Sequence, residues 1–480
     1  MSRGKAVMVL GTTSGAGKSW LATALCRWYA RQGLKVAPFK AQNMSNNARV
    51  VPGLNGLMGE IGSAQYFQAL AARRVPEVRM NPVLLRPEAD TQSQVVVLGE
   101  VDAALSRMPW RERSTLLKPR ARAALHELMS ENDVVVIEGA GSPAEINLAP
   151  SDYVNLGTAR DARAACLLVT DIDRGGAFAH LYGTHQLMPE DVRGLVKGFV
   201  LNRFRGDAGL LAPGPEQLEH LTGVPTIATL PMWRGHGLPE EDGVFDDAAA
   251  GEGLRIAVIA YPRISNLDEF QPLRQLPGVR LSWARSAADL AGVDWIILPG
   301  SKATAADLAW LRAQKLDIAI NAHRGRVLGI CGGLQMLGEA LIDTHGVDGN
   351  APGLGLLPLV TAFEPEKLLT STALRFGATD GPWAALAGVQ ADGYEIRHGR
   401  TRAHPGLPPP VVALRNAAGE AIGWQAGRVL GVYAHGLFEQ PAVLQALFGQ
   451  SGRSLDSVFD GLADFIDLHF QAGKIAGLIG

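Results

Sequence analysis

Residues 327–338 read VLGICGGLQMLG, and this stretch gives the clearest indication of the fold of the C-terminal half. Cys331 stands between a short apolar run, typical of a buried strand, and an apolar stretch compatible with a helix. Its neighbours complete the pattern G-x-C-x-G, in which small residues allow a sharp strand-to-helix turn that presents the central side chain. The pattern predicts a nucleophile elbow; the alternative is a cysteine buried in the core.

A thiol at such an elbow has the surroundings that nucleophilic catalysis needs. The N-terminus of the following helix favours the thiolate, and the amide of Gly332 can donate to an oxyanion. A second glycine turn, LPGSK at 298–302, follows a strand-like run and would present the amide of Ser301 to the same oxyanion. The apolar run GVYAHGLF at 431–438 contains His435, which we predict to be the base that partners Cys331.

The order of glycine turn, cysteine elbow and histidine resembles the class I glutamine amidotransferases. In that class a Cys–His pair hydrolyses glutamine and releases ammonia. The class usually carries a carboxylate two residues after the histidine, where this chain has Leu437. Glu395 is a candidate for the third member, but a contact with substrate or with another domain is an equally good interpretation. We therefore predict Cys331 and His435 as catalytic and leave the third member unassigned.

The N-terminal half carries an independent signal, GTTSGAGKS at residues 11–19. It follows the apolar run Ala6–Leu10 and precedes a helix-like stretch at Trp20–Arg31, which is where a phosphate-binding loop lies. Glycines let backbone amides converge on phosphate, a lysine adds positive charge and a serine hydroxyl can bind magnesium. The residues that we expect to bind nucleotide here are Gly15, Gly17, Lys18 and Ser19.

The spacing within this loop is unusual. Five residues, TTSGA, separate Gly11 from Gly17, whereas the common phosphate loop has four. This longer form resembles dethiobiotin synthetase and its relatives. A glycine turn that occurs here by chance is the alternative.

Three polar segments follow predicted strands of the N-terminal half, at the sheet edge where α/β proteins bind ligands. They read PFKAQNMSNN at 38–47, IEGAGSPAEINL at 137–148 and TDIDRGGAF at 170–178. Lys40 and the amides around it are costly to bury without a polar partner. Glu138 follows a buried strand, a position suited to holding Mg²⁺ beside phosphates. Each segment taken alone can also be a solvated turn.

The alternation of strand-like and helical runs indicates an α/β protein with two doubly wound domains. The runs 134–137, 165–169 and 195–201 are apolar enough for parallel strands that are buried on both faces. We predict a phosphate-loop domain at 1–230, similar to dethiobiotin synthetase, and a glutamine amidotransferase domain at 254–440. Residues 231–253, rich in Gly, Pro and acidic residues, are expected to be a linker, and 441–480 to form packing helices.

The composition of the 480 residues narrows the class of protein further. The chain has 45 basic and 47 acidic residues, a balance that calls for neither nucleic acid nor an anionic membrane surface as partner. Three cysteines in no spaced cluster suit a reducing compartment, and no apolar stretch approaches the ~18 residues of a membrane span. We expect a cytoplasmic enzyme that acts on small molecules, and leave its oligomeric state open.

Several segments together resemble the cobyric acid synthase family from Gly11 to Phe438. They include PFKAQNMSNN, MNPVLLRPEADTQSQVVVLG at 80–99, EGAGSPAEINL, DIDRGG, LNRFRGD at 201–207, DGYEIRHG at 392–399 and GVYAHGLF. The resemblance implies amidation of the b, d, e and g carboxylates of adenosylcobyrinic acid a,c-diamide, with ATP, Mg²⁺ and glutamine. Its substrates would be a corrin polycarboxylate and glutamine.

This resemblance also implies roles for residues at the ATP site. Ser19 and Glu138 would be the protein ligands of Mg²⁺. By similarity to dethiobiotin synthetase-like enzymes, Lys40 would hold phosphate or the substrate carboxylate, and Asn202 would face the adenine.

A scaffold without catalytic activity is disfavoured, because Lys18, Cys331 and His435 are all present. Two other functions remain open from the sequence. One is the related synthase that amidates the a and c carboxylates of cobyrinic acid, which shares both halves. The other is a partitioning-type ATPase that acts as a switch. Such switches carry an extra lysine where this chain has Thr13, and they lack a cysteine elbow domain.

Overall fold

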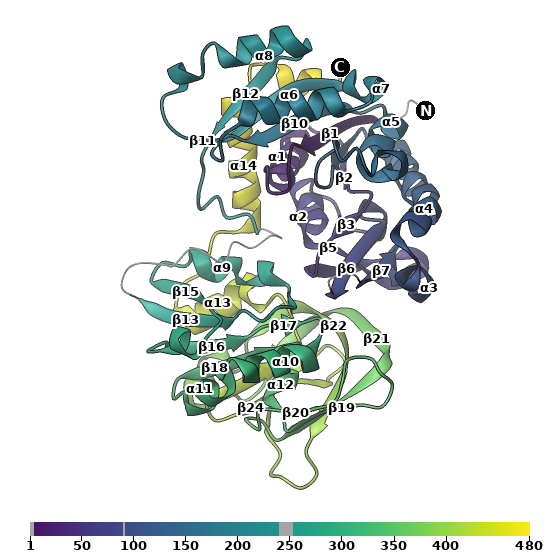
Figure 1. Cartoon of the computed structure of the whole chain (residues 1–480). Helices are drawn as coiled ribbons and strands as arrows, with labels where there is room; N and C mark the ends of the chain where they lie inside the picture. Colours follow the sequence, from purple (N-terminus) through teal and green to yellow (C-terminus); the bar gives the residue numbers. More distant parts are fainter. Residues whose placement is uncertain (1–3, 90–91, 240–252) are drawn as a thin grey trace. The chain divides into compact units, whose positions relative to one another are not determined.

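The structure is a computed structural model that describes residues 4–89, 92–239 and 253–480. The chain forms two compact units (Figure 1). Unit 1 comprises Met1–Ser45, Val51–Leu238 and Ser454–Gly480, and unit 2 comprises Asn46–Val50 and Pro239–Arg453. Most of the predicted linker, residues 240–252, lies outside the described residues.

In the described part of unit 1, a six-stranded sheet has the order β12-β11-β10-β1-β9-β2, and its paired strands are parallel. The three runs predicted as parallel strands are confirmed as β9, β10 and β11. The strands are β1 (Lys5–Gly11), β2 (Val36–Phe39), β9 (Val134–Glu138), β10 (Ala165–Asp171), β11 (Val196–Phe204) and β12 (Thr226–Pro231).

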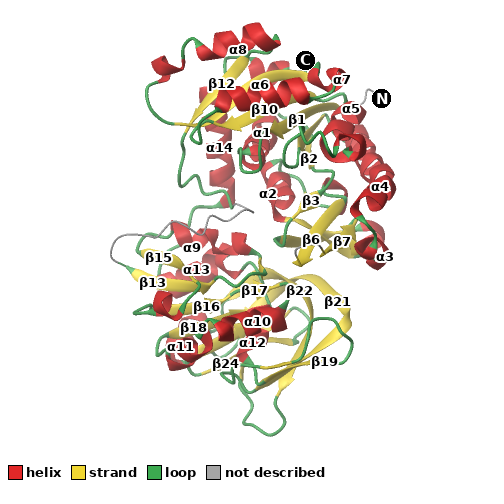
Figure 2. Cartoon of the chain, in the orientation of Figure 1, coloured by secondary structure: helices red, strands yellow, loops and turns green. Residues whose placement is uncertain are grey.

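Helices cover both faces of this sheet (Figure 2). Val7 and Val9 of β1 face one apolar core, whereas Ala6, Met8 and Leu10 face the other, as the period of two in a strand requires. The first core includes α1 (Lys18–Arg31), α2 (Ser63–Ala71) and α14 (Leu455–His469). The second includes α4 (Trp110–Glu131), α5 (Thr158–Ala162), α6 (Ala177–Leu187) and α8 (Gly214–Thr222).

Unit 1 also contains shorter elements. The strands β3 (Asn43–Met44), β6 (Val83–Ala89), β7 (Gln92–Val97) and β8 (Glu100–Val101) form a small separate sheet. The remaining helices are α3 (Ala103–Arg107), α7 (Glu190–Arg193) and α15 (Lys474–Gly477).

The C-terminal helix α14 packs against α1, although the two are far apart in the sequence. Arg27 and Asp460, with a sequence separation of 433, form an ion pair of 2.7 Å. Phe465 contacts Trp20 with ring centroids 5.6 Å apart. Leu462 and Ile466 are fully buried on the same side of the helix. The helices predicted at 441–480 therefore belong to different units: α14 lies in unit 1, whereas α13 (Pro441–Phe448) lies in unit 2.

Unit 2 contains a mixed sheet whose parallel part has the order β15-β13-β16-β18-β25. These strands are β13 (Leu254–Ile259), β15 (Val279–Ala284), β16 (Trp295–Leu298), β18 (Arg326–Ile330) and β25 (Val429–Val432). The helices around it are α9 (Gln271–Gln275), α10 (Thr304–Ala313), α11 (Leu316–Ala322), α12 (Gly332–Leu337) and α13. This part has the α/β character that the sequence predicts.

The sheet continues past β25 in a largely antiparallel arrangement that the sequence analysis did not anticipate. A long ribbon of β21 and β22 dominates it. The strands are β19 (Ala340–Asp343), β20 (Ala351–Pro352), β21 (Leu359–Phe376), β22 (Gln390–Ala403), β23 (Val411–Asn416) and β24 (Ala421–Ala426). As shown below, β22 passes the cysteine elbow.

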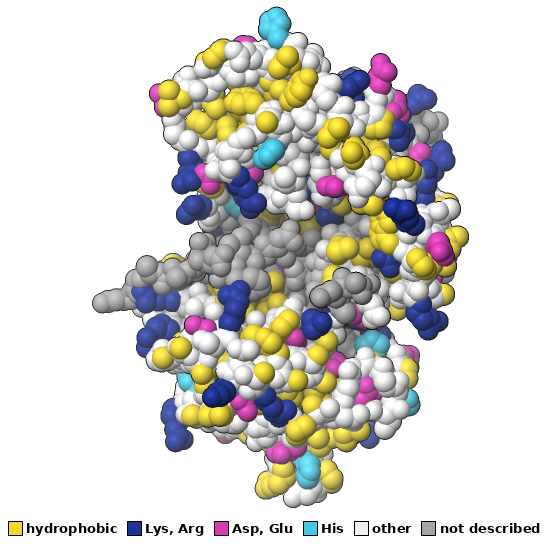
Figure 3. Space-filling view, in the orientation of Figure 1, with side chains coloured by type: hydrophobic (Ala, Val, Ile, Leu, Met, Phe, Trp, Pro, Cys, Tyr) yellow, Lys and Arg dark blue, Asp and Glu magenta, His cyan; other side chains and the backbone are white. Residues whose placement is uncertain are grey.

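Charged side chains are interspersed on the surface. On the face drawn in Figure 3, Lys and Arg lie scattered among acidic and uncharged side chains. Over the described ranges, no helix combines the length and the apolar character needed to cross a membrane.

Candidate active sites

The phosphate loop of unit 1 connects the end of β1 at Gly11 to the start of α1 at Lys18. Gly15 and Gly17 have φ values of 71° and 102°, in the left-handed region that side chains disfavour. A Cβ atom on Gly17 would lie 2.1 Å from Nδ2 of Asn202, so glycine is also required by close packing. The strand, loop and helix predicted from residues 6–31 are therefore present.

Lys18 folds back across this loop. Its Nζ atom donates to the carbonyl oxygens of Thr13, at 2.9 Å, and Gly141, at 3.0 Å. The side chain is buried, which holds its charge against the loop in which the amides would receive phosphate. Gly141 lies in the segment that follows Glu138, so two of the predicted ligand-binding segments meet at Lys18.

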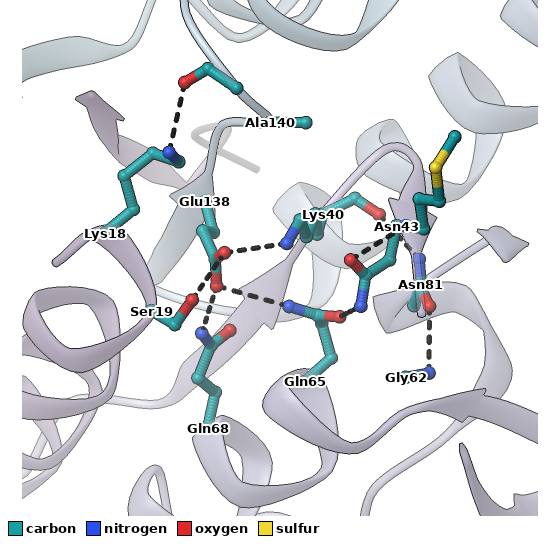
Figure 4. Close-up of polar contacts among 12 residues, drawn as sticks. Lys18, Ser19, Lys40, Asn43, Gly62, Gln65, Gln68, Asn81, Glu138 and Ala140 are labelled. Atoms are coloured by element: carbon teal, nitrogen blue, oxygen red, sulfur yellow. Dashed lines mark hydrogen bonds and ion pairs between the residues drawn. The ribbon is translucent and has the colours of Figure 1, made fainter. Parts of the chain in front are cut away.

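Glu138, the last residue of β9, is the centre of a buried polar cluster (Figure 4). Its Oε1 atom accepts from Ser19 Oγ at 2.8 Å and pairs with Lys40 Nζ at 2.7 Å. Its Oε2 atom accepts from the amides of Gln68 at 2.6 Å and Gln65 at 3.3 Å. The structure thus brings together three residues that the sequence analysis had placed at one site: Ser19, Lys40 and Glu138.

The cluster keeps Glu138 ionised. Burial alone raises the pKa of its carboxyl group, but the Lys40 ammonium and the hydrogen bonds from Gln68 and Ser19 lower the pKa below its usual value. Sequence reasoning missed Gln65 and Gln68. Their spacing of three residues, which places two amides on one side of α2, was the available signal.

Asn202 and Asp171 lie at the carboxyl ends of neighbouring strands and are paired in register. The Nδ2 atom of Asn202 donates to the carbonyl of Ala16 at 2.9 Å, so this side chain contacts the phosphate loop. Its expected contact with adenine stays a prediction. Asp171 pairs with Arg203 at 2.9 Å, so the third polar segment is also anchored at the sheet edge.

The donor set around Glu138 fits a magnesium ion that is bound together with nucleotide. Mg²⁺ usually takes one or two protein oxygens and completes its coordination with phosphate and water. Ser19 Oγ and the Glu138 carboxylate, 2.8 Å apart, are oxygens of this kind. Among the described residues, no group of three or more His, Cys, Asp or Glu side chains is placed to hold a metal ion.

In unit 2, Cys331 stands at the turn between β18 and α12, as the G-x-C-x-G pattern predicts. Its φ of 52° and ψ of −106° lie outside the regions that non-glycine residues prefer, so the turn is strained. The flanking glycines allow close packing: a Cβ on Gly329 would lie 2.7 Å from the backbone of Gly333, and one on Gly333 would lie 1.9 Å from the carbonyl oxygen of Leu298.

The two predicted oxyanion residues lie next to each other. A Cβ on Gly332 would lie 2.8 Å from the amide nitrogen of Ser301, so the elbow and the glycine turn after β16 are in contact. The Ser301 hydroxyl donates to Asp307 at 2.6 Å, which holds the turn onto α10. The structure therefore brings the two segments together, and their role as donors to an oxyanion stays a prediction.

His435 lies just past β25, and its imidazole is almost fully buried. Its Nδ1 atom is 3.2 Å from Oε1 of Glu269, whose Oε2 atom accepts from the amide of Gly436 at 3.3 Å. Tyr394 stacks on the imidazole with ring centroids 5.4 Å apart. The ring is thereby held in one orientation by a carboxylate on one edge and an aromatic face.

The charges around His435 favour its protonated form. Burial by itself lowers the pKa, but the Glu269 carboxylate, the Cys331 sulfur and side-chain hydrogen bonds to both raise it to about 10. The structure therefore brings Cys331 and His435 together and supports an imidazolium beside the sulfur.

The sequence analysis did not identify Glu269, because it considered only Leu437 and Glu395 as positions for the third member. Leu437 is buried and apolar at the position where the class usually has a carboxylate. The other candidate, Glu395, pairs with Arg397 at 2.6 Å. Glu269 comes from the short helix Leu267–Phe270. It lies beside His435 in space, but no spacing in the sequence indicates this contact.

Residues 46–50 of the chain support the segment that carries Glu269. Asn47 Oδ1 accepts from the amide of Leu267 at 2.8 Å, and Asn266 Nδ2 donates to the carbonyl of Ala48 at 3.0 Å. The buried guanidinium of Arg49 pairs with Asp268 and, at 2.5 Å, with Glu439. Part of PFKAQNMSNN, quoted above as a ligand-binding segment, thus stabilises the surroundings of the imidazole.

Both halves of the chain match known protein families. Residues 7–235 match the family model described as a CobQ/CobB/MinD/ParA nucleotide binding domain. Residues 255–443 match the model described as a CobB/CobQ-like glutamine amidotransferase domain. The fold and the two sites define a glutamine-hydrolysing amide ligase that uses a nucleotide.

Curated relatives identify the particular family. The cobyric acid synthase of Leptothrix cholodnii is 71% identical over 500 residues, covering 100% of this chain and 98% of that protein. The cobyric acid synthase of Methylibium petroleiphilum is also 71% identical, over 100% of this chain and 97% of that protein. That of Variovorax paradoxus is 67% identical over 99% of both chains. The chain belongs to the cobyric acid synthase family.

Proposed function

We propose that the chain amidates the b, d, e and g carboxylates of adenosylcobyrinic acid a,c-diamide, using ATP and ammonia from glutamine. One observation carries this proposal: a single chain contains both a phosphate loop, with Lys18 and the Ser19–Glu138 contact, and the Cys331–His435–Glu269 constellation. Either site alone would support a nucleotidase or a glutaminase. Together they support a ligase that activates a carboxylate and supplies the nitrogen.

In the first half-reaction, a substrate carboxylate attacks the γ-phosphorus of ATP and forms an acyl phosphate and ADP. Activation is needed because a carboxylate is a poor electrophile and its oxygen is a poor leaving group. Lys18, held between Thr13 and Gly141, supplies positive charge for the transferring phosphoryl group. Lys40, buried beside Glu138, is positioned to hold phosphate or the incoming carboxylate.

Mg²⁺ is proposed as the metal, with Ser19 and Glu138 as its protein ligands. When bound, the ion would neutralise charge on the β- and γ-phosphates. The lowered pKa of Glu138 supports this assignment, because a carboxylate must be ionised to bind a cation.

In the second half-reaction, the Cys331 sulfur attacks the side-chain amide carbon of glutamine. His435 donates its proton to the departing nitrogen, so that a glutamyl thioester and neutral ammonia form. A water molecule, deprotonated by His435, then hydrolyses the thioester to glutamate. Glu269 fixes the imidazole and stabilises its charged form. The amides of Gly332 and Ser301 would receive the oxyanion in both steps.

Ammonia then attacks the acyl phosphate, and the amide and inorganic phosphate are released. Neutral ammonia is required, because ammonium has no lone pair. The three cysteines are unpaired thiols, and the charges balance, which together support a cytoplasmic enzyme that acts on small molecules. The alternative substrate, cobyrinic acid itself, is less well supported, because the relatives quoted above are cobyric acid synthases.

Product analysis by mass tests the proposal. The full chain is incubated with ATP, Mg²⁺, glutamine and adenosylcobyrinic acid a,c-diamide, and in parallel with cobyrinic acid. Four successive replacements of acid by amide on the a,c-diamide are expected. No change in mass with that substrate, or two replacements on cobyrinic acid alone, would contradict the assignment.

A further inference from the structure

Glu395 and Arg397 of β22 form a buried ion pair that the steps above do not use. The Nε atom of Arg397 lies 2.6 Å from Oε2 of Glu395, and its Nη1 atom donates to the carbonyl of Gly399 at 2.7 Å. The Glu395 side chain is 0% exposed and that of Arg397 is 9% exposed. Among the described residues, Oε1 of Glu395 is buried and has no hydrogen-bond partner.

This pair lies beside the thiol. Ile396, between the two residues, has its carbonyl oxygen 3.5 Å from the sulfur of Cys331. Tyr394, one residue earlier, exchanges backbone hydrogen bonds with His435 at 2.9 and 3.4 Å. Residues 394–397 of β22 therefore pass along both catalytic groups of the glutaminase centre.

The guanidinium of Arg397 has a further contact that orients it. Its central carbon lies 4.0 Å from the ring centroid of Tyr433, which is buried two residues before His435. Stacking of this kind holds a guanidinium plane in place and leaves its edge available for a carboxylate. Glu395 and Arg397 are on the same face of β22, because they are two residues apart in a strand.

A buried carboxylate oxygen without a partner is unfavourable and indicates a cationic donor that the protein alone does not supply. Glutamine supplies one. When its amide carbon is at Cys331, its α-ammonium and α-carboxylate lie several bonds away. A strand rises about 3.4 Å per residue, so side chains adjacent to Ile396 are at a suitable distance from the thiol.

We propose that Glu395 and Arg397 bind the amino-acid end of glutamine: Oε1 of Glu395 accepts from the α-ammonium, and Arg397 pairs with the α-carboxylate. This inference rests on the proposed glutaminase function. It explains how the site would select free glutamine over glutamine side chains within proteins, which lack both charges. The two residues thus determine specificity and take no part in proton transfer.

Comparison of glutamine with glutaramate, which lacks the α-amino group, tests the role of Glu395. Ammonia release is measured for the full chain with ATP and the corrin substrate present, for the wild type and for Glu395→Gln. The wild type is expected to prefer glutamine strongly in kcat/KM. In Glu395→Gln this preference should fall at least about ten-fold, chiefly through a higher KM for glutamine.

The matched control is Glu366→Gln, which changes an exposed carboxylate on the neighbouring strand β21 and should retain the wild-type preference. Thermal unfolding followed by circular dichroism reports whether each variant is folded, and amidation supported by ammonium chloride should be unchanged. If Glu395→Gln does not fold, the same preference, kcat/KM for glutamine over kcat/KM for glutaramate, is measured in Glu395→Asp. This variant keeps the charge and withdraws the oxygen.

Arg397 is tested in the same way with 4-aminobutanamide, which lacks the α-carboxylate. Arg397→Met should lose the preference for glutamine over this analogue, and Arg397→Lys should restore part of it.

Two results would overturn the inference: equal use of glutamine and glutaramate by the wild type, or an unchanged preference in folded Glu395 variants. Failure of the wild type to hydrolyse glutamine at all would instead overturn the proposed function.

Discussion

Nδ1 of His435 lies 3.2 Å from Oε1 of Glu269, although 166 positions separate the two residues. The sequence analysis left the third member of this constellation unassigned, and Glu269 is the carboxylate that contacts the imidazole. Because Glu269 also accepts from the amide of Gly436, it fixes the backbone beside the histidine as well as the ring. Catalysis by His435 should depend on this one carboxylate.

Cys331→Ala should abolish glutamine-dependent amidation, because no other group in the site can form the glutamyl thioester. High ammonium chloride at alkaline pH should restore product formation, since neutral ammonia can attack the acyl phosphate directly. Product is measured with each nitrogen source side by side. Cys166→Ala, at another buried cysteine, is the control and should use both sources. Retained activity of Cys331→Ala with glutamine would remove the thiol from the mechanism.

Glu269→Gln should lower kcat for glutamine hydrolysis by about 10²- to 10⁴-fold, because the imidazole loses its orienting charge. Amidation with ammonium chloride should be little affected. Leu437→Met is the control at the position where related enzymes have their carboxylate, and it preserves the buried volume. Steady-state kinetics measure kcat with glutamine and with ammonium chloride. Equal kcat values for glutamine hydrolysis in Glu269→Gln and the wild type would exclude Glu269 from catalysis.

The pKa of His435, raised from 6.5 to about 10, should be visible by NMR of the labelled imidazole. A raised pKa means that the protonated ring stabilises the folded state. This contribution is complete below pH 6.5 and is lost as the pH rises through 10. The difference in unfolding free energy between wild type and His435→Gln should shrink over that interval. In Glu269→Gln the pKa should fall; an unaltered titration would assign the shift to another group.

Lys18→Ala should reduce amidation at least about 10²-fold with either nitrogen source, because acyl phosphate formation precedes both. Glutaminase chemistry at Cys331 does not use this lysine. Lys35→Ala, at an exposed position after α1, serves as the control. The assay is product formation with glutamine and with ammonium chloride, and near wild-type turnover of Lys18→Ala would contradict the phosphate-loop assignment.

Ser19→Ala should raise the Mg²⁺ concentration needed for half-maximal amidation by at least about ten-fold, because one proposed protein ligand is removed. Mg²⁺ is titrated at saturating ATP with ammonium chloride as nitrogen source, which isolates the ATP site. Ser130→Ala, which removes an exposed hydroxyl that donates to the carbonyl of Glu127, is the control. Identical Mg²⁺ curves for Ser19→Ala and the wild type would exclude Ser19 as a ligand.

The predictable features were those in which local sequence determines local geometry. Cys331 stands at a strand-to-helix turn because neither Gly329 nor Gly333 tolerates a Cβ, and Gly17 is required in the same way by Asn202. Lys40 follows β2 and Glu138 ends β9, and these parallel strands are neighbours in the sheet, so the contact between the two residues follows from topology.

The features that could not be predicted depend on contacts between distant segments. Nothing within the sequence near His435 indicates Glu269, and no periodicity reveals that β22 passes the thiol at Ile396. Gln65 and Gln68 give only a weak local signal, because an amide on a helix is usually solvated. In each case the missing information is the long-range packing that encloses a polar group.

The assignment of residues 46–50 to unit 2 and of residues 454–480 to unit 1 has a consequence for dividing the protein. A single cut in the linker would give two fragments, each of which contains a segment that belongs to the other unit. The N-terminal fragment would lack α14 and leave Arg27 without Asp460, and the C-terminal fragment would leave Asp268 without Arg49. To express the two units separately, residues 454–480 would have to be joined to unit 1 and residues 46–50 to unit 2. If the gene were split at the linker, the two fragments would have to associate to restore these contacts.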